Sequence, residues 1–219
     1  MTASGLKLAN ANSVAGKEIK NLFSSYYDYV AQRDLLAYSD YVSELAEKES
    51  SKLISNGSDE HAQVIIRNLL SHAKTEFCIL SSSLKESIYS NNSVIDALTN
   101  FLLKKDTKIR IILQDQGIDS IENLRKANKF IDTCLIHTAK KLHAEDEDEQ
   151  ERCVIKKASE KDAEIEEHFA IMDRTGYRFC PNIKGSEAIA TFSGAAVATH
   201  LREQFEILIY RAQPIPLQI

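Results

Sequence analysis

The sequence has no run of about 18 apolar residues, the length that a membrane-spanning helix needs. It has only four cysteines, Cys78, Cys134, Cys153 and Cys180, with no CxxC pair and no close cluster of metal ligands. We therefore expect reduced, buried thiols and no metal. The first 16 residues lack the basic start and apolar stretch of a signal peptide, so we expect a frayed tail and a cytoplasmic protein.

An excess of positive charge is also missing. The chain has 27 Lys+Arg against 32 Asp+Glu, a net charge of -5. Residues 145–167 hold eleven acidic and four basic side chains, a local net charge of -7. A strongly basic nucleic-acid surface is therefore not expected, although nucleic acid stays an open question. The acidic run 145–149 is predicted to be a solvated loop.

The composition that is present, 43% hydrophobic and 27% charged, is typical of globular proteins. At 219 residues the chain fits one large domain, or a domain with an appendage. The first third shows helical periodicity, beginning with the apolar stripe Ile19, Leu22, Phe23, Tyr26 and Val30. We therefore predict a helical N-terminal region over residues 1–72.

The character of the sequence changes after Ala73. Short apolar runs at 76–81 and 108–113 alternate with helical stripes, which is the order of a parallel sheet with crossover helices. The later runs predict further strands, at 153–155, 167–173, 177–179 and 188–192, and a last helix at 194–212. Residues 73–219 are therefore predicted to form a mixed α/β domain, with roughly six strands and helices on both faces.

One segment carries candidate chemistry. Glu166 and His168 are two residues apart on a predicted strand, so they share a face. Asp173 stands at the end of this strand, where a turn could bring it back over them. We expect the three side chains together at one end of the sheet, within reach of Ser193. The structural alternative is a strand histidine that is hydrogen-bonded by either acid.

Other polar residues are candidates for binding. Ser81 and Ser82 follow the first sheet strand, and carboxyl ends of parallel strands are where open α/β sheets bind ligands. The alternative is that these serines only form a loop. Arg178 lies on the next strand of the hairpin and is expected to pair with Asp173.

The order of elements and these residues together resemble the phospholipase D-like superfamily, over about residues 73–212. That family carries H-x-K-x4-D on a strand and its following turn, and a Ser/Asn segment before a helix. Aligned on Asp173, the sequence has Glu166 in the histidine position and His168 in the lysine position. Ser193 stands near the Ser/Asn segment. The resemblance implies a fold in which two such motifs meet, from two halves of a chain or two subunits.

The departures from the motif decide the expected chemistry. In active members the histidine attacks phosphorus and the lysine neutralises phosphate charge. Glu166 would instead repel a phosphodiester, by about 4 kcal/mol at ~4 Å and an effective dielectric near 20. The resemblance therefore implies a pseudoenzyme without a cofactor, an accessory subunit of a cytoplasmic bacterial complex of the defence-related kind.

Two alternatives stay open: a homodimeric phosphodiesterase or nuclease with an atypical site, and a nucleotide or anion sensor. The expected partners are a second copy of the chain or another protein, and no membrane. The tyrosines of the helical region offer an interaction surface, because tyrosine is enriched in interface cores. Those considered are Tyr26, Tyr27, Tyr29, Tyr38 and Tyr41.

Overall fold

The computed structural model describes residues 32–139, 152–182 and 187–215. It divides the chain into two compact units, Met1–Asp40 and Tyr41–Ile219. In the first unit, residues 32–40 are helical. The stripe predicted from Ile19 to Val30 and the acidic run 145–149 lie outside the described residues. All that follows concerns the second unit.

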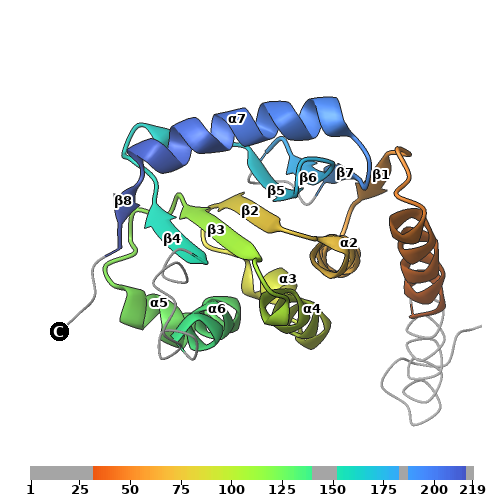
Figure 1. Ribbon diagram of the computed structural model, residues 1–219, viewed down its shortest axis with the longest axis horizontal. Coiled ribbons are helices and arrows are strands. Elements are labelled where there is room, and N and C mark those ends of the chain that lie inside the picture. Colours follow the sequence, from red (N-terminus) through yellow and green to blue (C-terminus); the bar gives the residue numbers. More distant parts are fainter. Residues whose placement is uncertain (1–31, 140–151, 183–186, 216–219) are drawn as a thin grey trace, which may run out of the picture. The chain divides into compact units, whose positions relative to one another are not determined.

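In its described residues, the second unit is built on a mixed sheet of eight strands (Figure 1). Its middle is parallel: β2 (Glu76–Ser81) pairs with β3 (Lys108–Leu113), and β3 pairs with β4 (Cys153–Lys157). The prediction that the first two of these strands are neighbours is confirmed. The other strands run antiparallel to their neighbours, in the sheet order β1-β7-β6-β5-β2-β3-β4-β8: β1 (Ile54–Asn56), β5 (His168–Met172), β6 (Gly176–Cys180), β7 (Ala188–Thr191) and β8 (Gln213–Pro214).

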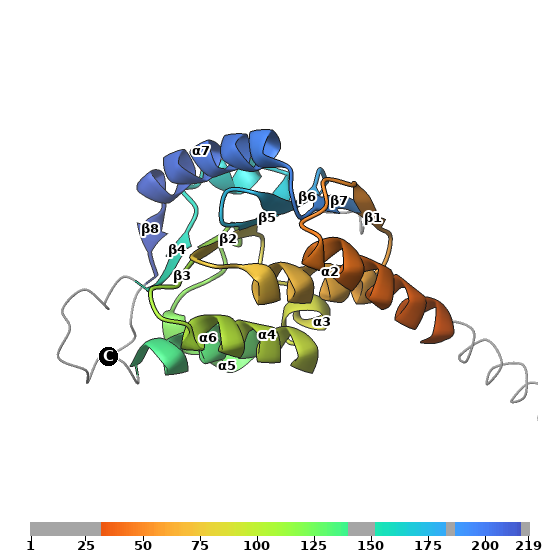
Figure 2. The same ribbon diagram turned by 45° about the vertical axis from the view of Figure 1, so that its right-hand side comes forward.

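Helices cover both faces of the sheet, as predicted for the α/β class. Figures 1 and 2 show α7 (Ala195–Arg211) across one face, with most of the other helices on the opposite side. β1 and β8 were not predicted, because two or three residues are too few to show a strand pattern. The remaining helices are α2 (Asp59–His72), α3 (Glu86–Tyr89), α4 (Asn92–Leu103), α5 (Ile121–Ala127), α6 (Lys129–Ala139) and the short 3-10 turn η2 (Asp162–Glu164).

The central strand β2 is buried on both faces, which explains its unbroken apolar run. Successive side chains of a strand point to opposite faces. Phe77 contacts Phe101 of α4 edge-on, with 6.4 Å between ring centroids. Leu80 belongs instead to the cluster on the α7 side, which includes Phe169 of β5 and Phe205 of α7. The sheet is thus held between two apolar layers.

Two elements that precede Ala73 take part in this sheet domain. β1 pairs with β7, with Ile54 opposite Ala190. The helix α2 is capped by Ser58, whose hydroxyl accepts a 3.2 Å hydrogen bond from the His61 N–H, and its Ile65 and Leu69 are fully buried. The division into a helical region, 1–72, and an α/β domain, 73–219, stays a prediction. Expressing the two fragments separately would show whether each folds without the other. In the described part of the chain, no helix is long and apolar enough to cross a membrane.

Candidate functional site

The structure separates Asp173 from His168, one of the two residues with which it was expected to cluster. β5 runs antiparallel to β2, with Phe169 opposite Leu80 and Met172 opposite Phe77. His168 therefore lies at the carboxyl end of β2, while Asp173 lies at its amino end. Five residues of extended strand span roughly 16 Å. The expected cluster is therefore wrong, because the turn at Asp173 leads into β6 and does not fold back over β5.

His168 accepts a hydrogen bond from the backbone. The Ser82 N–H donates to Nε2 of the imidazole over 3.1 Å. A nitrogen that accepts carries no proton, so the ring hydrogen of the neutral form is on Nδ1. Burial, and then the positive charge of Arg178, lowers the pKa of His168 to about 4. The imidazole is therefore neutral near pH 7, and its Nε2 lone pair is already engaged.

The residues around His168 differ in part from those predicted. Ser81 and Ser82 are here, as strand order implied: the buried Ser81 hydroxyl accepts from the Leu84 N–H over 3.3 Å. Cys180 is directly opposite His168 in the ladder, and its thiol donates to the Asn182 carbonyl over 3.2 Å. The sequence reading missed Cys180 and Asn182. A hairpin that turns after Asp173 has a register that pairs His168 with Cys180, and this register would have predicted both residues as neighbours of His168.

Ser193 lies near the other end of the hairpin. β7 is antiparallel to β6, so it ends beside Tyr177, which is opposite Thr191. The Ser193 N–H is 3.4 Å from Oγ1 of Thr191, and the next residue, Gly194, bonds to the Thr175 carbonyl. The expectation that Ser193 reaches His168 is therefore wrong, because the two residues lie at opposite ends of antiparallel strands.

Arg178 is almost fully buried, with 8% of its surface exposed. Its Nε donates to Oδ1 of Asn56 over 3.0 Å, which ties β6 to β1. The expected pairing with Asp173 is wrong, because the register places Arg178 opposite Ala170, two residues before the end of β5. Glu166, the remaining candidate, has an exposed side chain in the segment between η2 and β5.

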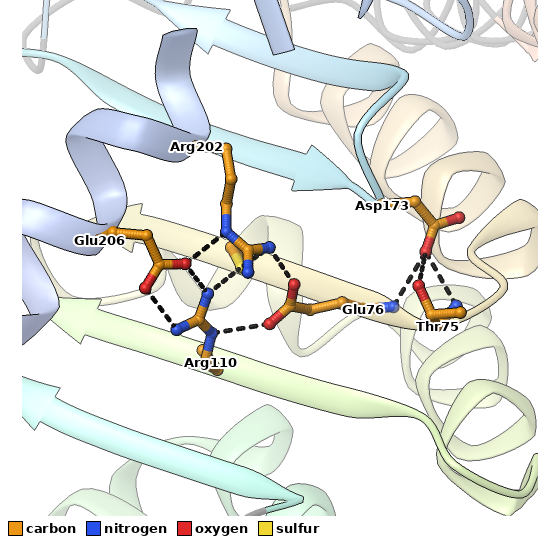
Figure 3. A network of polar contacts seen from close by, with 7 residues as sticks. Thr75, Glu76, Arg110, Asp173, Arg202 and Glu206 are labelled. Atoms are coloured by element: carbon orange, nitrogen blue, oxygen red, sulfur yellow. Dashed lines mark hydrogen bonds and ion pairs between the residues drawn. The ribbon is translucent and has the colours of Figure 1, made fainter. Parts of the chain in front are cut away.

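Asp173 holds the amino end of β2 in place. Its carboxylate accepts hydrogen bonds of 2.8–2.9 Å from the N–H groups of Thr75 and Glu76 and from the Thr75 hydroxyl (Figure 3). It also accepts one of 2.9 Å from the Lys74 N–H. Burial raises the pKa of this carboxyl, but the hydrogen bonds together outweigh burial and bring it below its ordinary value. Asp173 also has a left-handed backbone, with φ of 53°. The aspartate of the motif is therefore a structural cap.

The sequence reading also missed a network of four charged side chains beneath α7, which we call the α7 charge network: Glu76, Arg110, Arg202 and Glu206 (Figure 3). Nε of Arg110 lies 2.8 Å from Oε1 of Glu76, and its Nη1 lies 3.0 Å from Oε2 of Glu206. Nε of Arg202 lies 2.6 Å from Oε1 of Glu206, and Arg202 also contacts Glu76.

The α7 charge network fastens the helix to the sheet. Arg202 and Glu206 are four residues apart on α7, and they face Glu76 of β2 and Arg110 of β3. The pKa of Glu206 is lowered to about 2, mainly by the hydrogen bond that its carboxylate accepts from Arg110. Burial and the nearby Glu76 charge raise the pKa of the adjacent Cys78 to about 12, so this thiol stays protonated. Each carboxylate is matched by a guanidinium, which points to a structural role.

A groove runs between α7 and the strands β5 and β6. Its volume is about 520 Å³, and we call it the α7 groove. Val197 and Ile207 of α7 are 45% and 56% exposed along it, which is high for apolar side chains. Among the described residues, no group of three His, Cys, Asp or Glu side chains is placed to hold a metal. The groove is lined by Leu80, Ile165, Glu167, Phe169, Phe179, Val197, His200, Leu201, Gln204, Ile207, Leu208 and Arg211.

The fold is a mixed α/β domain in which Asp173 and His168 lie at opposite ends of one strand. The chain belongs to the family described as "Domain of unknown function (DUF7931)", whose model matches residues 58–217. That match begins at the Ser58 cap of α2 and ends just after β8. No curated protein matches the chain in sequence.

Solved structures with very low sequence identity are similar to it. The archaeal chromatin protein TrmBL2, described as showing a novel mode of DNA binding, has a TM-score of 0.51 at 12% identity, over 94% of this chain and 71% of its own. Nuc of Salmonella typhimurium, described as a phospholipase D family member, has a TM-score of 0.48 at 13% identity, over 74% and 97%. NucT from Helicobacter pylori has 0.46 at 9%, over 74% and 99%. At these identities the likeness concerns the fold alone.

Proposed function

We propose that this chain is a non-catalytic, phospholipase D-like binding protein, a pseudoenzyme that acts by association. The observation that supports this most directly is the state of His168. A nucleophile needs an accessible lone pair, but Nε2 of His168 is engaged by the Ser82 N–H and Nδ1 carries the proton. His168 itself stands in the lysine position of the motif, and the position of the nucleophilic histidine holds Glu166, whose charge repels phosphate. The Asp173 carboxylate is bound by the residues that begin β2.

The purified protein is expected not to hydrolyse bis(p-nitrophenyl) phosphate, DNA or RNA above background. His168→Gln should behave in the same way, because the glutamine carbonyl can still accept from the Ser82 N–H and neither side chain attacks phosphorus. The measurement is product release against a buffer blank, with Glu203→Gln, an exposed acid of α7 outside the motif, as the control variant. Hydrolysis that wild type shows and His168→Gln loses would instead establish the homodimeric nuclease alternative.

The partner that we propose is a second copy of the chain, bound through the α7 groove. The groove offers exposed apolar side chains from Val197 and Ile207. Its sheet side carries Glu167, while its helix side carries His200 and Arg211, the latter also paired with Asp162. In an isologous contact the same patch meets itself, and a two-fold axis between its acidic and basic sides places the acid of one copy opposite the bases of the other. A surface with both signs of charge suits this arrangement.

Light scattering is therefore expected to show a mass that rises with concentration from 24.6 kDa toward twice that value. Ile207→Asp should keep the protein at the monomer mass, because it places a charge in the apolar contact. Leu103→Asp is the matched control: Leu103 is 61% exposed at the end of α4, and it does not line the groove. A wild-type protein that stays monomeric at all micromolar concentrations would contradict self-association and favour a different protein partner.

The remaining alternatives, an anion or nucleotide sensor and a DNA-binding protein, predict different binding measurements. A nucleotide or anion sensor would bind inorganic phosphate or a nucleotide with an affinity that Arg178→Met or Ser82→Ala changes. DNA binding, the property for which TrmBL2 is described, would be salt-dependent. The net charge of -5 argues against such binding here.

A further inference from the structure

Two cysteines that are distant in sequence meet in the fold. Cys134 lies on α6 and Cys153 begins β4, two elements that pack directly against each other. The two side chains meet at this contact, where the Cys153 thiol interacts with that of Cys134. Cys153 is opposite Ile109 in the ladder, so it faces the side of the sheet on which α4 and α6 pack (Figure 1). None of the four cysteines, all of which the structure describes, is in a disulfide.

The two thiols differ in their access to solvent. Cys134 is fully buried, whereas Cys153 is only half-buried. Burial and the hydrogen bond to Cys153 raise the pKa of Cys134, which keeps that residue in the thiol form. A reagent in solution would therefore meet Cys153 first, and the Cys134 thiol that interacts with it could react next. The other two cysteines are buried elsewhere: Cys78 beside the α7 charge network, and Cys180 opposite His168.

We propose that Cys134 and Cys153 form a dithiol site that hydroperoxides oxidise to an intramolecular disulfide. In the first step the sulfur of Cys153 attacks the outer oxygen of the hydroperoxide. The O–O bond breaks, an alcohol or water leaves, and Cys153 becomes a sulfenic acid. In the second step the Cys134 thiol attacks the sulfur of Cys153, its proton passes to the departing hydroxyl group, and water leaves. The two thiols lose two electrons and two hydrogens in total, and the hydroperoxide is reduced.

The disulfide would connect α6 covalently to β4. It would join the two ends of the sequence segment that carries the acidic run 145–149. A cross-link that closes such a segment restricts the unfolded chain, so the oxidised protein is expected to melt at a higher temperature than the reduced one. This proposal does not depend on the proposed binding function.

The test begins with the fully reduced, folded protein and hydrogen peroxide. The number of reactive thiols, measured in denaturant after the reaction, should fall from four to two. The mass should fall by about 2 Da, and a peptide map should contain one cross-link between Cys134 and Cys153. A thiol reductant should reverse both changes. Cys180→Ser is the control, and it should still lose two thiols to this cross-link.

Single variants separate the two steps. Cys134→Ser should stop at a sulfenic acid on Cys153, which a carbon nucleophile such as dimedone traps. Cys153→Ser should form no intramolecular disulfide. Circular dichroism of each variant before oxidation establishes that it is folded. The proposal is overturned if native wild type keeps all four thiols under conditions in which the unfolded chain reacts, or if Cys153 oxidises without linking to Cys134.

Discussion

Replacing Arg110 with methionine is expected to lower the free energy of unfolding by about 3 kcal/mol, the lower end for removing one partner of a buried ion pair. Arg110 is 13% exposed and lies between two carboxylates, Glu76 and Glu206. Methionine fills a similar volume but leaves both acids with less compensation, and Glu76 itself is only 16% exposed. The half-exposed Glu206 can turn toward water, which is why we expect the lower end of the range.

Urea unfolding measures this effect, and Arg125→Met is the matched control. Arg125 pairs with Asp132 near the surface, where the side chains are 44% and 35% exposed. Such a pair contributes about 0–1 kcal/mol. Arg110→Lys should fall between wild type and Arg110→Met, because lysine keeps the charge but not the forked geometry. Equal losses for the two methionine variants would show that the α7 charge network does not fasten α7 to the sheet.

Replacing Asp173 with alanine is expected to lower the free energy of unfolding by roughly 3 kcal/mol. The N–H groups of Lys74, Thr75 and Glu76 lose their charged acceptor, and alanine is strained at a φ of 53°. Asp173→Asn should lose less, because asparagine tolerates this conformation and keeps one oxygen acceptor. Urea or thermal unfolding at pH 7 distinguishes the two variants.

The pH dependence of the free energy of unfolding tests whether the charge of Asp173 stabilises the start of β2. Its pKa is lowered in the folded protein, so the unfolded chain binds the proton more readily. The stabilisation is therefore complete above the ordinary value of 3.8 and is lost as the pH falls through the lower folded pKa. Wild type should thus lose its advantage over Asp173→Asn in acid. An advantage that does not change with pH would mean that the Asp173 charge is not what holds β2.

Periodicity in the sequence predicted the elements that lie in the apolar layers. The unbroken apolar runs of β2 and β3 identified buried parallel neighbours. The strands predicted at 167–173 and 177–179 are the β5 and β6 of the hairpin. These features could be predicted because burial is recorded locally, in the spacing of apolar side chains along one element.

The candidate site depended on information that local spacing does not contain. Glu166, His168 and Asp173 were expected together, but an extended strand carries its two ends about 16 Å apart, and only the antiparallel pairing with β2 decides which neighbour each end meets. His168 is hydrogen-bonded to the Ser82 N–H. Asp173 is hydrogen-bonded to Thr75 at the start of β2, which is 98 residues earlier in the sequence.

The sequence by itself determined the α/β class, the two central strands and the helices that cover them. Only the tertiary structure decided which polar groups became partners: Arg110 with Glu206, Asp173 with Thr75, and Cys134 with Cys153. The physical reason is that burial of an apolar side chain needs any apolar neighbour, whereas a hydrogen bond or ion pair needs one particular atom at about 3 Å. That atom comes from a distant part of the chain, and only the assembled sheet and helices bring it into place.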